Sequence, residues 1–82
     1  MQTISAGARG VEVLFLQRML NKHGASPQLV EDADFGPRTR DAVVAFQRAR
    51  GITPPNGTVD TRTWNALGLA VEVEQNAVAQ RG

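Results

Sequence analysis

The 82-residue sequence contains no cysteine, one histidine, one tryptophan and three phenylalanines. Without cysteine there is no disulfide and no thiolate metal site, so the fold must rest on hydrophobic burial and on local helix signals. The lone histidine, His23, has no serine and carboxylate in a familiar arrangement with it, and no EF-hand pattern is present. We therefore expect no catalytic residue, no metal site and no cofactor in this chain.

Long apolar runs and a strong net charge are also missing. No segment approaches the roughly 18 apolar residues of a membrane span, and the start, MQTISAGARG, lacks the basic and then apolar run of a secretory signal. A net charge of +1 is low for a protein that binds nucleic acid. The sequence therefore predicts one small soluble domain that is made in the cytoplasm and binds neither nucleic acid nor a membrane.

Three segments show the patterns of short helices. Residues 11–23 carry apolar side chains at spacings of three and four, and a glycine follows them. The second segment, about 37–50, opens with Pro37, whose fixed φ suits a first helical turn, and it also ends before a glycine. The third, TRTWNALG, is capped by Asp60 and closed by Gly68. These patterns predict an all-α fold of three helices.

The second and third helices begin with related sequences, DFGPRTRDAV at 34–43 and TVDTRTWNAL at 58–67. Gln17 and Gln47 precede the two units, and we expect their amides to satisfy backbone groups of the following loops. The paired positions share a role as core plug, helix cap or first-turn threonine: Phe35 and Val59, Gly36 and Asp60, Thr39 and Thr63. The fold is therefore predicted to be a small closed three-helix bundle with an internal pseudo-repeat.

The spacings resemble those of the three-helix peptidoglycan-binding domain that is attached to cell-wall hydrolases and phage endolysins. Its pattern is present as GxxVxxLQxxLNxxG, then FGxxTxxAVxxFQxxxG, then GxVxxxTWxxL, over roughly residues 7–68. The resemblance implies a non-catalytic module that binds peptidoglycan at the bacterial cell wall and anchors a tethered catalytic domain. It places the binding domain at 1–68, as the N-terminal part of a phage-type endolysin or bacterial hydrolase, with 69–82 as a C-terminal extension or linker.

The chain departs from the family pattern at three places, of which Asp60 in place of a glycine alters only a helix cap, and the other two are as follows. Relatives carry glycine in the sequence D-G-x-F-G, where this chain has Ala33, so we expect a different path for the loop before the second helix. Relatives also carry polar residues where this chain has Leu14 and Phe15. Both departures mark positions at which the structure is informative.

Ligand binding is expected at exposed positions around the helix starts. The N–H groups of a helix N-terminus beside an arginine can bind a carboxylate. The second helix has such a start at Gly36 with Arg38, and the third helix has one beside Arg62. Asp34 is expected to receive a stem-peptide amine, and one ring face of Trp64 to contact a sugar. The predicted ligand-binding residues are Asp34, Phe35, Gly36, Arg38, Thr39, Arg40, Arg62 and Trp64.

An apolar surface on the first helix indicates an alternative function. Val11, Leu14 and Phe15 lie opposite the core face, where an amphipathic helix should be polar. Three covers stay open: the tail of the chain, a second copy in a homodimer, or an absent catalytic domain. The alternative is therefore a protein–protein interaction module of the same fold.

Overall fold

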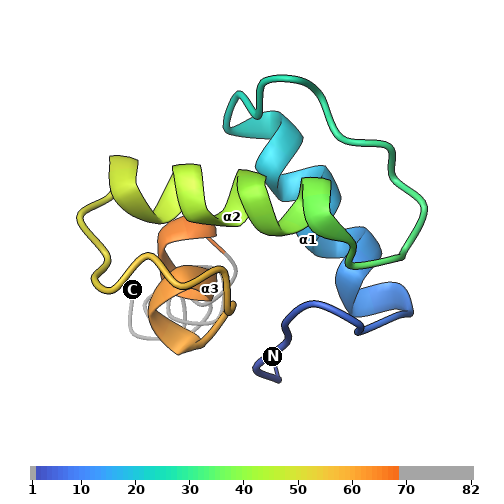
Figure 1. Ribbon diagram of the computed structural model, residues 1–82, viewed down its shortest axis with the longest axis horizontal. Coiled ribbons are helices and arrows are strands. Elements are labelled where there is room, and N and C mark those ends of the chain that lie inside the picture. Colours follow the sequence, from blue (N-terminus) through green and yellow to red (C-terminus); the bar gives the residue numbers. More distant parts are fainter. Residues whose placement is uncertain (1, 69–82) are drawn as a thin grey trace, which may run out of the picture.

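The computed structural model describes residues 2–68, and these fold into three helices joined by two long loops (Figure 1). α2 crosses α1, and α3 lies against the C-terminal half of α2. The elements are α1 (Val11–Lys22), α2 (Pro37–Ala49) and α3 (Thr61–Leu67). Residues 2–68 contain no sheet, so the predicted all-α fold is confirmed. The predicted extension at 69–82 lies outside the described residues.

The helix boundaries follow from the local signals in the sequence. Pro37 is the first residue of α2, and α3 begins after Asp60, whose carboxylate accepts a hydrogen bond from the Thr63 N–H at 3.2 Å. α3 ends at Gly68, which has the left-handed conformation with φ 108°. All three helices thus lie within two residues of their predicted bounds.

A single core lies between the helices and receives side chains from all parts of the chain. Phe35 and Val59, the predicted plugs, are 1% and 0% exposed. The remaining buried apolar residues are Ile4, Val13, Leu16, Leu20, Leu29, Val43, Phe46, Trp64 and Leu67. The two repeat units therefore share one hydrophobic interior.

The N-terminal segment joins the two units, which the sequence did not predict. Ile4 exchanges two backbone hydrogen bonds with Val59, at N–O distances of 3.1 and 2.8 Å. A few residues later the segment reaches Phe35, whose N–H donates to the carbonyl of Ala8 at 3.0 Å. The segment from Ile4 to Ala8 is therefore fixed to both plug loops.

Two buried glutamines hold the loops, as the repeat predicts. Gln17 accepts a hydrogen bond from the Ala33 N–H at 2.9 Å, and Gln47 accepts one from the Gly57 N–H at 3.0 Å. Each glutamine also donates to the threonine in the first turn of the next helix: Gln17 to Thr39 at 3.2 Å and Gln47 to Thr63 at 3.0 Å. The expectation that both amides satisfy loop backbone groups is confirmed.

The two loops match most closely at Ala33 and Gly57. Both residues have positive φ, 64° for Ala33 and 78° for Gly57. A Cβ atom on Gly57 would lie 2.8 Å from Cγ of Arg40, so that position requires glycine. Alanine at position 33 therefore adopts the left-handed conformation that its counterpart in the second unit also has.

Candidate functional site

Four of the predicted ligand-binding residues surround one hollow of about 390 Å³ at the start of α2. The loop before α2 forms one wall of the hollow, and the first turn of the helix forms the other. The four residues are Asp34, Gly36, Arg38 and Thr39. The other four predicted residues lie elsewhere.

The N-terminus of α2 opens without a side-chain cap. Gly36 is the N-cap and has no side chain to offer, and the first turn of α2 contains no acidic residue. The N-terminus of α3 is different, because Asp60 fills it. The partial positive charge of the α2 dipole is therefore left available to an anion from outside the chain.

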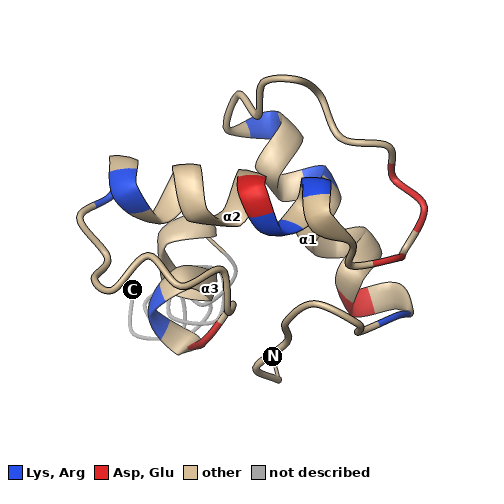
Figure 2. Cartoon of the chain, in the orientation of Figure 1, with Lys and Arg blue, Asp and Glu red and all other residues tan. Residues whose placement is uncertain are grey.

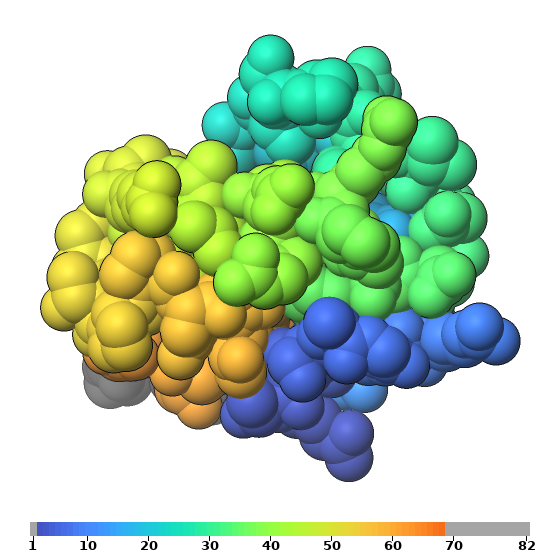
Figure 3. Space-filling view, in the orientation of Figure 1, coloured from blue at the N-terminus to red at the C-terminus, as the bar shows by residue number. Residues whose placement is uncertain are grey.

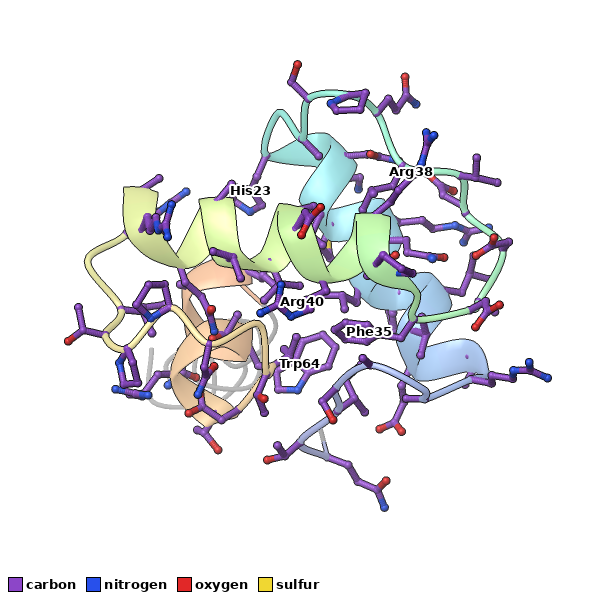
Figure 4. All side chains as sticks on the ribbon, viewed as in Figure 1. His23, Phe35, Arg38, Arg40 and Trp64 are labelled. Carbon is purple, nitrogen blue, oxygen red and sulfur yellow. The ribbon has the colours of Figure 1, made fainter. Side chains whose placement is uncertain are left out.

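Arg38 adds a full positive charge beside this helix end. Its side chain is exposed and projects from the first turn of α2 toward the preceding loop (Figure 4). Within residues 2–68 it forms no ion pair with a carboxylate, unlike Arg9, Arg18, Arg40 and Arg62. The guanidinium is therefore free to bind a carboxylate.

The other side of the hollow is acidic, because Asp32 and Asp34 line it. Figure 2 shows acidic positions along the loop before α2. Asp34 lies 3.7 Å from the guanidinium of Arg9, and this contact is exposed. Asp32 accepts a hydrogen bond from the Gln17 amide at 3.0 Å. That bond, followed by one from the Asp34 N–H, holds the pKa of Asp32 below its usual value. The hollow thus presents a positive and a negative edge, and Asp32 is a residue that the sequence analysis missed.

Three predicted residues, Phe35, Thr39 and Trp64, are buried rather than exposed. Phe35 is part of the core, so its side chain has no surface for a direct ligand contact. Thr39 borders the hollow but is 3% exposed, and its hydroxyl accepts the hydrogen bond from Gln17. Phe35 and Thr39 therefore position the loop and the start of α2.

The expected exposed ring face of Trp64 is wrong. The side chain is 2% exposed, and its indole N–H donates to the carbonyl of Gln2 at 2.8 Å. Trp64 and Phe35 lie together beneath α2, where the N-terminal segment covers them (Figure 4). The N-terminal segment, which was not predicted to pack on the core, contributes to this burial through the carbonyl of Gln2.

The remaining two arginines are engaged away from the hollow. Arg40 lies 3.6 Å from Asp41 and packs on Gly57. Arg62 pairs with Asp60 at 3.2 Å and donates to the carbonyl of Thr53 at 3.0 Å.

Asp60 occupies the site at the start of α3 where a ligand carboxylate was predicted. Partial burial favours its neutral form, but hydrogen bonds from the Thr63 N–H and from Arg62 hold the pKa of Asp60 below its usual value. Asp60 is therefore a charged cap at neutral pH. Its carboxylate occupies the N-terminus of α3, where the sequence analysis predicted a carboxylate of the ligand.

A second and larger hollow lies between the C-terminal end of α1, the loop after it, and α2 (Figure 3). This groove has a volume of about 450 Å³. Arg38 borders both the groove and the smaller hollow, so the two form adjoining parts of one surface. The sequence analysis missed the groove, although alanines at spacings of three and four along α2 were a visible signal for a shallow helix face.

Residues 2–68 contain neither a metal-ligand cluster nor a helix that could cross a membrane. No three side chains among histidines and carboxylates gather there in a way that could hold a metal ion. None of the three helices combines the length and apolar character that crossing a membrane requires.

Comparison with known families matches residues 9–67 to the family described as "putative peptidoglycan binding domain". The crystal structure of the Burkholderia AP3 phage endolysin is 40% identical with a TM-score of 0.77, over 84% of this chain and 26% of the endolysin. A peptidoglycan-binding protein from Clostridioides difficile, in complex with glutamine hydroxamate, is 36% identical with a TM-score of 0.77, over 82% of this chain and 40% of that one.

The SleB N-terminal domain is 33% identical with a TM-score of 0.76, and the match covers 84% of this chain and 92% of that domain. A comparison with curated proteins finds no match. The chain therefore spans about a quarter of the endolysin, two fifths of the Clostridioides protein and nearly all of the SleB domain.

Proposed function

The chain belongs to the family of peptidoglycan-binding domains, and we propose that it anchors a lytic enzyme to the bacterial cell wall through the uncapped N-terminus of α2. The domain itself is a non-catalytic binding module of the kind found in endolysins and cell-wall hydrolases. Its ligand is a charged part of the wall polymer. The observation that carries the proposal is the helix end without a side-chain cap beside Arg38, which forms no ion pair within residues 2–68.

The chemistry of the hollow suits the stem peptides of peptidoglycan, which offer carboxylates, amides and amines. A carboxylate at the start of α2 would accept hydrogen bonds from backbone N–H groups and a charge-assisted bond from Arg38. An amine on the same stem would lie toward Asp34, whose carboxylate is paired only with an exposed arginine. Gly36 leaves the approach to the helix end open, because it carries no side chain.

The larger protein is proposed to be a phage-type endolysin or a bacterial hydrolase. Residues 1–68 would be its binding domain, and 69–82 an extension or a linker to the catalytic domain. The support is the match to part of an endolysin together with the match to an N-terminal domain. Weak attachment to an insoluble polymer would raise the effective concentration of the tethered active site at the wall.

A pelleting assay tests the proposal with purified chain and protein-free peptidoglycan sacculi, with chitin and double-stranded DNA as negative controls. We expect Arg38→Ala to weaken retention roughly tenfold, since a hydrogen bond to a charged group is lost. Arg48→Ala is the matched control, because it removes the same charge from the same helix away from the hollow. Equal losses in both variants would show that only net charge matters and would remove α2's N-terminus as the site.

One observation favours a second candidate, a protein–protein interaction module. Val11 is 73% exposed and Phe15 46% exposed, and Leu14 is half-buried between them on the surface of α1. A homodimer through these residues would bury them. A folded chain that fails to pellet with sacculi but sediments as a dimer, and becomes monomeric with Phe15→Ser, would favour this candidate.

A further inference from the structure

The groove between the end of α1 and α2 has no role in the site described above. Its floor is apolar and is formed by Leu20, Leu29 and Phe46 together with three small residues of α2, namely Ala42, Ala45 and Ala49. Because these alanines stand along one face, the surface of α2 is low there, and the backbone of a bound chain could lie close to the helix. Such a floor suits small apolar side chains.

Charged residues border the groove in a fixed order along α2. Arg38 stands at the start, Asp41 follows one turn later, and Arg50 stands at the far end. Within residues 2–68, neither Arg38 nor Arg50 forms an ion pair, whereas four other arginines each pair with a carboxylate. The groove therefore offers one arginine on either side of Asp41, whose carboxylate also lies 3.6 Å from the exposed Arg40. Basic residues lie at both ends of α2 in Figure 2.

Two contacts hold the guanidinium of Arg50 at the end of the groove. Its guanidinium lies 5.1 Å from the ring centroid of Phe46 and donates to Nδ1 of His23 at 3.1 Å. The other ring nitrogen of His23 then carries its hydrogen and donates to the carbonyl of Leu67 at 3.1 Å. These contacts fix the guanidinium at the groove's end while leaving donors free, which lowers the entropy cost of binding a carboxylate.

The length of the groove sets the length of the ligand. Arg38 and Arg50 lie twelve residues apart, which corresponds to roughly 18 Å along a helix axis. An extended peptide rises about 3.3 Å per residue, so roughly five to six residues would cover the distance between these two backbone positions. The guanidinium of Arg50 lies over the ring of Phe46, eight residues after Arg38, and roughly four residues would cover the distance of about 12 Å from Arg38 to that point. The volume of about 450 Å³ lies within the range of small-ligand sites.

We propose that this groove binds a peptidoglycan stem peptide along its length. In this arrangement the internal carboxylate of the stem pairs with Arg38, the side-chain amine of its diamino acid faces Asp41 in place of Asp34, and the terminal carboxylate pairs with Arg50. Alanine methyl groups of the stem lie on the alanine floor. This inference rests on the proposed wall-binding function and extends it from one helix end to the whole of α2.

The test is a titration of the ¹⁵N-labelled chain with a synthetic stem tetrapeptide that carries free carboxylates and a free side-chain amine. We expect backbone amide shifts on both sides of the groove, in residues 24–29 and 42–50. Arg50→Gln should raise the dissociation constant roughly tenfold, as the loss of one charge-assisted hydrogen bond implies. When its carboxylates are amidated, the same peptide should bind the unaltered chain no more tightly than the unmodified peptide binds Arg50→Gln.

A pair of isosteric substitutions gives a test that does not touch Arg50. Ala45 is exposed on the groove floor, so both Ala45→Glu and Ala45→Gln should fold. Only glutamate places a negative charge beneath a ligand with two carboxylates, so Ala45→Glu should bind the peptide several-fold more weakly than Ala45→Gln. Equal affinities for the two variants would overturn the proposal.

The sacculus assay separates the two levels of the argument. Binding to sacculi with no shifts in the groove, or with shifts confined to the hollow at Asp34 and Gly36, would overturn the groove and leave wall binding intact. Failure to bind both sacculi and peptide would overturn both. Binding to both, with the losses expected for Arg50→Gln and Ala45→Glu, would establish the groove as the stem site.

Discussion

Replacing Ala33 by glycine should stabilise the domain. Ala33 has a φ of 64°, a left-handed conformation that costs a residue with a Cβ atom about 1–2 kcal/mol. Glycine removes that cost but gives the unfolded chain more freedom, which takes back about 0.4–1 kcal/mol. The net gain is about 0.5–1 kcal/mol, or a rise in Tm of roughly 3–6 °C for a domain of this size. The hydrogen bond from the residue 33 N–H to Gln17 should remain, because it uses only the backbone.

The measurement is thermal and urea unfolding of the two chains, followed by circular dichroism at constant pH and salt. The equivalent position in the second unit supplies the control, because Gly57→Ala should be destabilising by more than 1 kcal/mol. Its new Cβ would meet Arg40 at 2.8 Å, in addition to the strain of a φ of 78°. A lower midpoint for Ala33→Gly would refute the strain argument, and an unchanged stability for Gly57→Ala would refute the equivalence of the two loops.

Two further predictions concern the second unit. Gln47→Leu should lower the free energy of unfolding by about 2–4 kcal/mol, because the Gly57 N–H and the Thr58 carbonyl lose their buried partner. Chemical unfolding would measure this change, and a loss below about 1 kcal/mol would contradict the role assigned to Gln47. Asp60→Ala should cost about 1 kcal/mol at neutral pH through loss of the α3 cap. Because the pKa of Asp60 is lowered in the folded state, its contribution is present above the unfolded pKa and disappears as pH falls through the folded pKa. The difference in Tm between the unaltered chain and Asp60→Ala should therefore shrink in acid, and a constant difference from about pH 6 to about pH 2 would count against the charged cap.

The helices and their repeat were predictable because their signals are local. Pro37, Asp60 and Gly68 act within one helical turn, and the structure places each where its chemistry requires. The roles of Gln17 and Gln47 could be predicted because the same glutamine recurs before the same loop pattern. Periodicity also identified the exposed Val11 and Phe15.

The N-terminal segment and the groove were not predictable from local signals. Ile4 is an isolated apolar residue, and its pairing with Val59 joins positions far apart in the chain. The same segment supplies the carbonyl of Gln2 that accepts the hydrogen bond from the Trp64 indole N–H. The groove depends on where the end of α1 lies relative to α2, a property of tertiary packing. The binding residues predicted around Arg38 stay predictions, and the groove residues were not among them.

The sharing of α2 by the two repeat units restricts how a chain of this kind can change in length. α2 takes part in both units. Its Thr39 accepts the hydrogen bond from Gln17, and its Gln47 donates the equivalent hydrogen bond to Thr63. One residue inserted between Thr39 and Gln47 would turn one half of the helix by about 100° relative to the other. Neither unit could then keep its amide in place, so insertions and deletions should be tolerated in the two loops and excluded from the middle of α2.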